Sequence, residues 1–169
     1  MLGYLQVYTG DGKGKSTAAF GLALRARGVN LRVHLIQFIK NKPSSETAML
    51  RKIGVKVSQF GSGVLFGRPV SQADIASSRR GLGEMRPQFV HAGSDILILD
   101  EINVALSCAL VDENEFHGLL DLRPQSMEVI CTGRGAPQSL IQRADLVTEM
   151  QVVKHYFQAG VPARMGIEK

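Results

Sequence analysis

One run of nine residues sets the architecture of this 169-residue chain: Thr9-Gly10-Asp11-Gly12-Lys13-Gly14-Lys15-Ser16-Thr17. It follows an apolar run from Tyr4 to Tyr8 and opens a segment of small residues with helical spacing, from Ser16 to Ala26. A loop rich in glycine and lysine between a strand and a helix is typical of a phosphate-binding loop, or P-loop. The alternative is a flexible glycine turn with incidental lysines, but it leaves the flanking strand and helix unexplained.

The residue types in this loop suit the triphosphate of ATP together with a magnesium ion. Glycines let successive backbone N–H groups approach phosphate oxygens, and the start of the following helix adds its positive dipole end. Lys15 brings a mobile positive charge to oxygens that the backbone cannot reach, and the Ser16 hydroxyl is placed to bind Mg²⁺. The strict P-loop pattern has glycine where this chain has Thr9, so the match departs from it at one position.

An acidic pair provides a second signature. The apolar run from Ile96 to Leu99 ends in Asp100 and Glu101, and in a doubly wound sheet we expect this strand end to lie beside the phosphate loop. One carboxylate can then hold Mg²⁺ while the other orients its shell, whereas the alternative is that Asp100 only caps the following helix. Arg134 follows another strand at the same edge, where it either reaches a phosphate or a substrate carboxylate or remains a surface arginine.

Short apolar runs alternate with longer segments of helical period, a pattern typical of a parallel sheet with crossover helices. The expected strands are Tyr4–Tyr8, Arg32–Phe38, Val55–Phe60, Asp95–Asp100, Met127–Thr132 and Leu146–Met150. The expected helices are Ser16–Ala26, Asp74–Ala92 and Glu113–Leu122, and residues 41–45 are expected to form a surface loop. The sequence therefore predicts an α/β, P-loop NTPase-like fold with a doubly wound, mainly parallel sheet of about six strands and helices on both faces. No repeat or break in composition marks a second domain, so residues 1–169 are expected to form a single domain.

Composition narrows the classes of partner. The net charge is +5, but lysines and arginines are scattered along the chain, so nucleotide phosphates are enough to explain it. Aromatic residues make up only 6% of the chain and Trp is absent, which disfavours a surface that stacks nucleic-acid bases. Two cysteines, and apolar stretches all shorter than the roughly 18 residues of a membrane span, favour a cytoplasmic protein without membrane contact.

Further motifs, in order along nearly the whole chain, carry a family resemblance. They are Gly10–Gly21, Gln37-Phe38-Ile39-Lys40, Leu99-Asp100-Glu101-Ile102-Asn103, Thr132-Gly133-Arg134, Ala144–Met150, Lys154-His155 and Gly166-Ile167-Glu168. This ordered set resembles the ATP:corrinoid adenosyltransferases of the CobA/CobO/BtuR type. The resemblance implies transfer of the 5′-deoxyadenosyl group of ATP to the Co(I) centre of a corrinoid of the cobalamin or cobinamide type, in coenzyme B12 biosynthesis or salvage. Triphosphate is the implied leaving group.

The resemblance also assigns roles to residues. Lys15 and Glu101 are expected to be catalytic, and Ser16, Asp100 and Glu101 are expected to bind Mg²⁺. The residues expected to bind ATP are Thr9, Gly10, Asp11, Gly12, Lys13, Gly14, Lys15, Ser16, Thr17 and Arg134. Co(I) is itself a strong nucleophile toward the ribose C5′ carbon, so the implied reaction needs positioning and charge neutralisation instead of a general base.

The Gly63–Phe66 part of the loop at residues 61–69 matches the place where the family holds the flat corrinoid. Val64 and Phe66 are expected to contact it, where better-known members carry Phe and Trp at the same spacing. The alternative for this loop is an apolar plug on the protein's own core. The family also implies a homodimer and a flavoprotein-type electron donor for the corrinoid. Since the first expected strand begins at Tyr4, we expect closure of the site by another segment or by the partner subunit.

Two other functions stay open on the residues alone. A P-loop small-molecule kinase or ATPase cleaving at the γ-phosphate uses the same loop, and it yields ADP instead of triphosphate. The third possibility is a non-enzymatic module that binds ATP and corrinoid without turnover. A GTP-binding switch is not supported, because Asn41-Lys42 lacks the aspartate of a guanine-reading Asn-Lys-x-Asp sequence.

Overall fold

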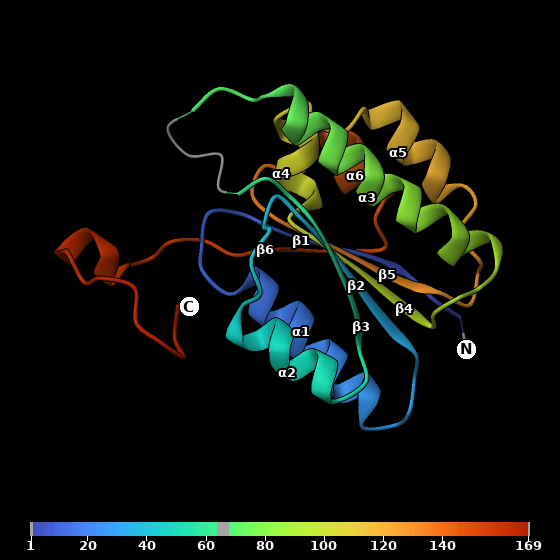
Figure 1. Cartoon of the computed structure of the whole chain (residues 1–169), viewed down its shortest axis with the longest axis horizontal. Coiled ribbons are helices and arrows are strands. Elements are labelled where there is room, and N and C mark those ends of the chain that lie inside the picture. Colours follow the sequence, from blue (N-terminus) through green and yellow to red (C-terminus); the bar gives the residue numbers. More distant parts are fainter. Residues whose placement is uncertain (1, 64–67, 169) are drawn as a thin grey trace.

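The computed structural model describes residues 2–63 and 68–168. Six strands form one parallel sheet in the order β3-β2-β4-β5-β1-β6 (Figure 1). They are β1 (Leu5–Thr9), β2 (Val33–Phe38), β3 (Lys56–Phe60), β4 (Ile96–Asp100), β5 (Glu128–Thr132) and β6 (Leu146–Glu149). All six predicted strands are confirmed, as is the predicted doubly wound α/β architecture. The sheet is parallel in every pair.

Helices cover both faces of the sheet (Figure 1). One face carries α1 (Lys15–Arg27) and α2 (Ser45–Lys52), and the other carries α3 (Gln72–Val90), α4 (Ile102–Ser107), α5 (Glu113–Leu120) and α6 (Gln138–Arg143). A 3₁₀ turn, η1 (Tyr156–Ala159), lies in the C-terminal segment. The predicted helices correspond to α1, α3 and α5, whereas α2, α4 and α6 were not predicted.

The small residues of α1 explain how closely this helix packs on the sheet. Ala19 and Ala23 are fully buried, so the helix backbone approaches the strands without large side chains between them. The predicted surface loop at residues 41–45 extends one residue too far, because α2 already begins at Ser45. A capping box between Ser44 and Thr47 fixes that start: the Thr47 amide donates to the Ser44 hydroxyl at 3.3 Å, and the Ser44 amide donates to the Thr47 hydroxyl at 2.9 Å.

The strand order separates the acidic strand from the phosphate-loop strand by one strand, a spacing about which the sequence made no prediction. The acidic strand β4 does not lie directly beside the phosphate-loop strand β1, because β5 is inserted between them. The physical reason is that consecutive strands of a doubly wound sheet need not be neighbours, so an adjacency cannot be read from the order of segments in the sequence. All strands run parallel, so the carboxyl ends of β1, β5, β4 and β2 still meet at one edge of the sheet.

His34 on β2 gives the fold a pH dependence that can be measured. Its side chain is 1% exposed, and its Nε2 lies 3.0 Å from the Ser58 hydroxyl. Burial, with a smaller contribution from Lys56, outweighs the opposing effects of Gln88 and Glu84 and lowers the pKa of His34 to about 4. A base whose pKa is lowered by folding stabilises the fold above its unfolded pKa, and this stabilisation is lost as the pH falls toward the folded value.

We therefore expect the free energy of unfolding to fall by about 2 kcal/mol on account of His34 between about pH 7.5 and pH 5. His34→Gln keeps a partner for Ser58 but does not titrate, so its stability should change less over the same interval. Urea unfolding of both proteins at each pH measures the difference. Equal pH dependence in the two proteins would contradict the assignment.

Among residues 2–63 and 68–168, no helix combines the length and the apolar character that crossing a membrane requires.

Candidate active site

The phosphate loop connects β1 to the first turn of α1, as the sequence predicts. Gly10 and Gly14 have φ angles of 90° and 123°, a region that favours glycine. Gly12 is required for another reason: its amide donates to the Met150 carbonyl at 2.6 Å, and a Cβ atom there would lie 2.6 Å from the same oxygen. The chain leaving β6 therefore packs directly against the loop and fixes its path.

The Lys15 ammonium lies over its own loop. Its Nζ donates to the carbonyls of Gly10 and Gly12, both at 2.6 Å. Burial, together with the positive charge of Arg134, lowers the pKa of Lys15, although Glu101 opposes this shift. A nucleotide can take these hydrogen bonds over, because the loop carbonyls are neutral acceptors and phosphate oxygens are charged ones.

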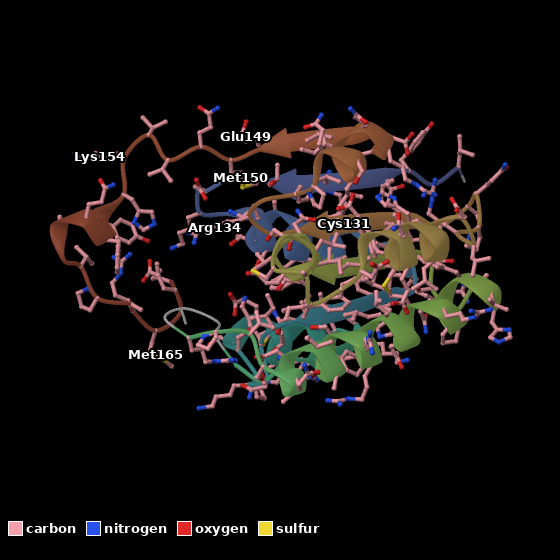
Figure 2. All side chains as sticks on the ribbon, turned by 90° about the horizontal axis from the view of Figure 1, so that it is seen from above. Cys131, Arg134, Glu149, Met150, Lys154 and Met165 are labelled. Atoms are coloured by element: carbon pink, nitrogen blue, oxygen red, sulfur yellow. The ribbon has the colours of Figure 1, made fainter. Side chains whose placement is uncertain are left out.

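Lys13, the second lysine of the loop, contacts the C-terminal segment (residues 151–168). Its Nζ donates to the Tyr156 hydroxyl and to Glu168 Oε1, both at 2.8 Å, and Arg164 binds the same carboxylate. Figure 1 shows this segment projecting beyond the edge of the sheet where the phosphate loop lies, and in Figure 2 it arches from Met150 past Lys154. Residues at the far end of the sequence thus reach the phosphate loop.

The acidic pair lies at the carboxyl end of β4, where its two members differ in environment. Asp100 is fully buried, and its oxygens accept hydrogen bonds from Gln37 Nε2 and the Thr132 hydroxyl, both at 2.7 Å. Glu101 occupies the N-cap of α4 with a φ of 64°. The alternative that Asp100 caps α4 is therefore wrong, because its carboxylate is used within the sheet.

Several neighbouring groups influence the pKa of Glu101. Burial, followed by the adjacent Asp100, raises the pKa of Glu101, whereas Lys40, Lys15 and Arg134 act in the opposite direction. Lys40 Nζ lies 3.8 Å from Asp100 Oδ2 and 3.9 Å from Glu101 Oε1. The end of β2 thus supplies the positive charge nearest to the pair, and Lys15 also lies within electrostatic range of Glu101.

Arg134 lies at the same edge, immediately after β5 (Figure 2). Its Nε is 3.6 Å from Asp11 Oδ1, so the side chain reaches across to the phosphate loop. Asn103 holds the turn before it, because Asn103 Nδ2 donates to the carbonyls of Tyr8 and Gly133 at 3.2 and 3.1 Å. Arg134 thus combines the exposure of a surface arginine, 55% of its side chain, with a position beside the phosphate loop.

The oxygen ligands at this edge fit Mg²⁺ held together with a nucleotide. Magnesium is usually bound by one or two carboxylates, waters and substrate phosphates instead of a complete protein cage. Asp100 and Glu101 could supply the carboxylates, and Ser16, in the first turn of α1, could supply a hydroxyl. Within the described ranges 2–63 and 68–168, no group of three or more His, Cys, Asp or Glu residues could hold a metal by itself.

The predicted corrinoid contacts, Val64 and Phe66, lie outside the described residues. The flanking residues are anchored: Arg68 binds the buried Asp74 with NH1 at 2.6 Å and NH2 at 2.8 Å. The hydroxyl of Ser62 donates to the same carboxylate. The arginine and these hydrogen bonds hold the pKa of Asp74 well below its usual range.

Sequence reasoning missed several residues that the fold brings to the site. Lys40 and Gln37 were noticed only as part of a motif, and the contact of Lys13 with Tyr156 and Glu168 was not foreseen. The sequence likewise predicted no role for Thr132. Their shared signal is a polar residue at the carboxyl end of an apolar strand, which is where ligands bind in open α/β sheets.

Comparison with known proteins agrees with the resemblance in the sequence. Residues 1–168 match the family model described as ATP:corrinoid adenosyltransferase BtuR/CobO/CobP. A corrinoid adenosyltransferase of Pseudomonas aeruginosa is 37% identical over 169 residues, which cover 98% of this chain and 83% of the relative. Corrinoid adenosyltransferases of Escherichia coli K12 and Salmonella typhimurium (CobA) are 35% and 36% identical over 167 residues, covering 98% of this chain and 85% of each relative. The chain therefore belongs to the ATP:corrinoid adenosyltransferase family.

Proposed function

We propose that this chain transfers the 5′-deoxyadenosyl group of ATP to the Co(I) centre of a corrinoid and releases triphosphate. The observation that carries the proposal is a P-loop whose lysine lies within electrostatic range of Glu101, one of an acidic pair at the same sheet edge, in a chain of this family. A bond forms between cobalt and C5′, the C5′–O bond breaks, and its electron pair leaves with the triphosphate.

The protein's part in this reaction is positioning and charge neutralisation. The loop amides and the N-terminus of α1 bind phosphate oxygens, and Lys15 exchanges its contacts with Gly10 and Gly12 for the departing triphosphate. Lys13 and Arg134 lie beside the same loop, where each is paired with a carboxylate: Glu168 for Lys13 and Asp11 for Arg134. No proton leaves the attacking cobalt, so the absence of a general base from the scheme is consistent with the chemistry.

Ser16, Asp100 and Glu101 are the proposed ligands of Mg²⁺, which neutralises charge on the triphosphate when bound. Asp100 is the proposed direct ligand, because it is held rigidly from both sides. Glu101, whose side chain is 26% exposed and faces both Lys15 and Lys40, is the proposed catalytic partner of Lys15. Val64 and Phe66 remain the proposed corrinoid contacts.

The proposal also includes partners and compartment. Co(I) must be generated by an electron donor, for which a flavoprotein is the proposed class. Apolar side chains of the C-terminal segment are exposed, 96% for Val153 and 76% for Phe157, and they support a homodimer in which these side chains are covered. Cys108 and Cys131 are both free, which supports a reducing cytoplasm.

The phosphate product separates this function from its rival. The protein is incubated with ATP, Mg²⁺ and chemically reduced cobalamin or cobinamide, and the products are separated by ion exchange. We expect triphosphate together with a light-sensitive cobalt–carbon product in equal amounts. ADP formed in a corrinoid-independent way would instead establish a kinase or ATPase, and binding of both substrates without any product would establish a carrier.

A further inference from the structure

A continuous chain of side-chain hydrogen bonds crosses four strands at the carboxyl edge of the sheet. Gln59 on β3 donates its Nε2 to Gln37 Oε1 at 2.8 Å, and Gln37 on β2 donates its own Nε2 to Asp100 Oδ2 at 2.7 Å. Thr132 on β5 completes the chain by donating to Asp100 Oδ1 at 2.7 Å. The register places Gln37 opposite both Gln59 and Asp100, so the row is a feature of the sheet itself.

The donor and acceptor roles in this row of hydrogen bonds follow from the chemistry of the side chains. A carboxylate can only accept, so Gln37 must turn its NH₂ group toward Asp100 and its carbonyl toward β3. A donor is then required on β3, and the amide of Gln59 supplies it while a second bond to the Lys42 carbonyl, at 3.0 Å, holds that amide in place. Gln37 is 1% exposed and Asp100 is fully buried, so water does not replace these contacts.

We propose that Gln37 and Gln59 are positioning residues that orient Asp100 toward the metal of the bound nucleotide. Each oxygen of Asp100 accepts one hydrogen bond from a neutral side chain and keeps further lone-pair capacity for a cation. Gln59 acts at a distance, because it fixes which end of the Gln37 amide faces the carboxylate. This inference rests on the proposed nucleotide site and names the residues that preorganise it.

The sharpest test replaces Gln59 by Glu and, as the matched control, by Leu. A carboxylate at position 59 cannot donate, so the Gln37 amide rotates to donate to it and presents its carbonyl oxygen to Asp100. Arg51, whose NH2 lies 3.3 Å from Gln59 Oε1, can pair with the new carboxylate and keep the variant folded. Gln59→Leu removes the donor without imposing the reversed amide.

Calorimetry measures ATP affinity in saturating Mg²⁺ and in EDTA for each protein. For Gln59→Glu we expect affinity in Mg²⁺ to weaken by about tenfold, the effect of losing one hydrogen bond to a charged group, with little change in EDTA. Gln59→Leu should weaken it by less than about threefold. Simple electrostatics predicts the opposite sign, because an added negative charge near the site attracts the cation.

The double variant Gln37→Met, Gln59→Glu isolates the mechanism. Methionine has no amide to rotate, so Gln59→Glu should have no further effect in this background, and the two changes should be strongly non-additive. Thermal unfolding checks that every variant is folded. Tighter or unchanged ATP affinity in Mg²⁺ for folded Gln59→Glu would overturn the proposed positioning roles of Gln37 and Gln59. Additive effects in the double variant would overturn them as well. Failure of the wild-type protein to bind ATP would instead overturn the proposed function.

Discussion

Replacing Lys15 by alanine is expected to lower kcat/KM for adenosyl transfer by about 10²–10³-fold, because the loop loses the charge that meets the departing triphosphate. Among residues 2–63 and 68–168, this ammonium is bound only by the carbonyls of Gly10 and Gly12, which water can satisfy in the variant. The free energy of unfolding should therefore change by less than about 2 kcal/mol. Steady-state kinetics and urea unfolding measure the two effects separately.

Lys13→Ala is the matched control for this experiment. It removes a lysine from the same loop, but one whose ammonium is bound by Tyr156 and Glu168. We expect its kcat/KM to fall by no more than about tenfold, because the positive charge of Lys13 is already paired with the Glu168 carboxylate. Equal losses in the two variants would contradict the division of roles between the lysines, and an unfolded Lys15→Ala protein would assign Lys15 a structural role.

The fold was predictable because its signals are local. Each strand is an apolar run bounded by turn residues, and the run from Ile96 to Leu99 is fully or almost fully buried in the structure, as parallel strands require. The helices that were not predicted are short: α2 has eight residues, and α4 and α6 have six each, which leaves little length for a helical period to stand out.

In the candidate site, too, the residues that are neighbours in the sequence were predictable, and the contacts between distant residues were not. Loop residues such as Gly12 and Lys15 are adjacent in sequence and were predicted together, although the packing of Gly12 against Met150 was not. The contact of Lys13 with Glu168 joins residues 155 positions apart, and the contact of Gln37 with Asp100 depends on strand order. Strand order is a property of the whole sheet, so the hydrogen bonds that join Gln59, Gln37 and Asp100 cannot be predicted without knowing that β2 lies beside β4.

Asp100→Asn is expected to abolish most of the contribution of Mg²⁺ to ATP binding, with affinity in Mg²⁺ falling by about 30-fold or more and affinity in EDTA nearly unchanged. The side chain keeps its shape but loses the charge that a divalent cation requires. Its hydrogen bonds can be kept, because the amide oxygen accepts from Gln37 and the amide NH₂ donates to the Thr132 hydroxyl, which can reverse its role. Calorimetry at several Mg²⁺ concentrations measures the change.

The melting temperature of Asp100→Asn shows whether its loss of ATP affinity comes from lost Mg²⁺ binding or from a destabilised fold. Asp100 is a buried charge, and Lys40 Nζ, 3.8 Å from Oδ2, is its nearest cation. The Lys40 side chain is 43% exposed, so its ammonium stays solvated when the charge of Asp100 is removed, and the desolvation penalty of the buried carboxylate is removed as well. We therefore expect the melting temperature of Asp100→Asn to equal or exceed that of the wild-type protein. Thr132→Val, which keeps the carboxylate, should retain Mg²⁺-dependent binding; if it lost that binding as completely as Asp100→Asn, the hydrogen bond and not the charge would be the essential feature.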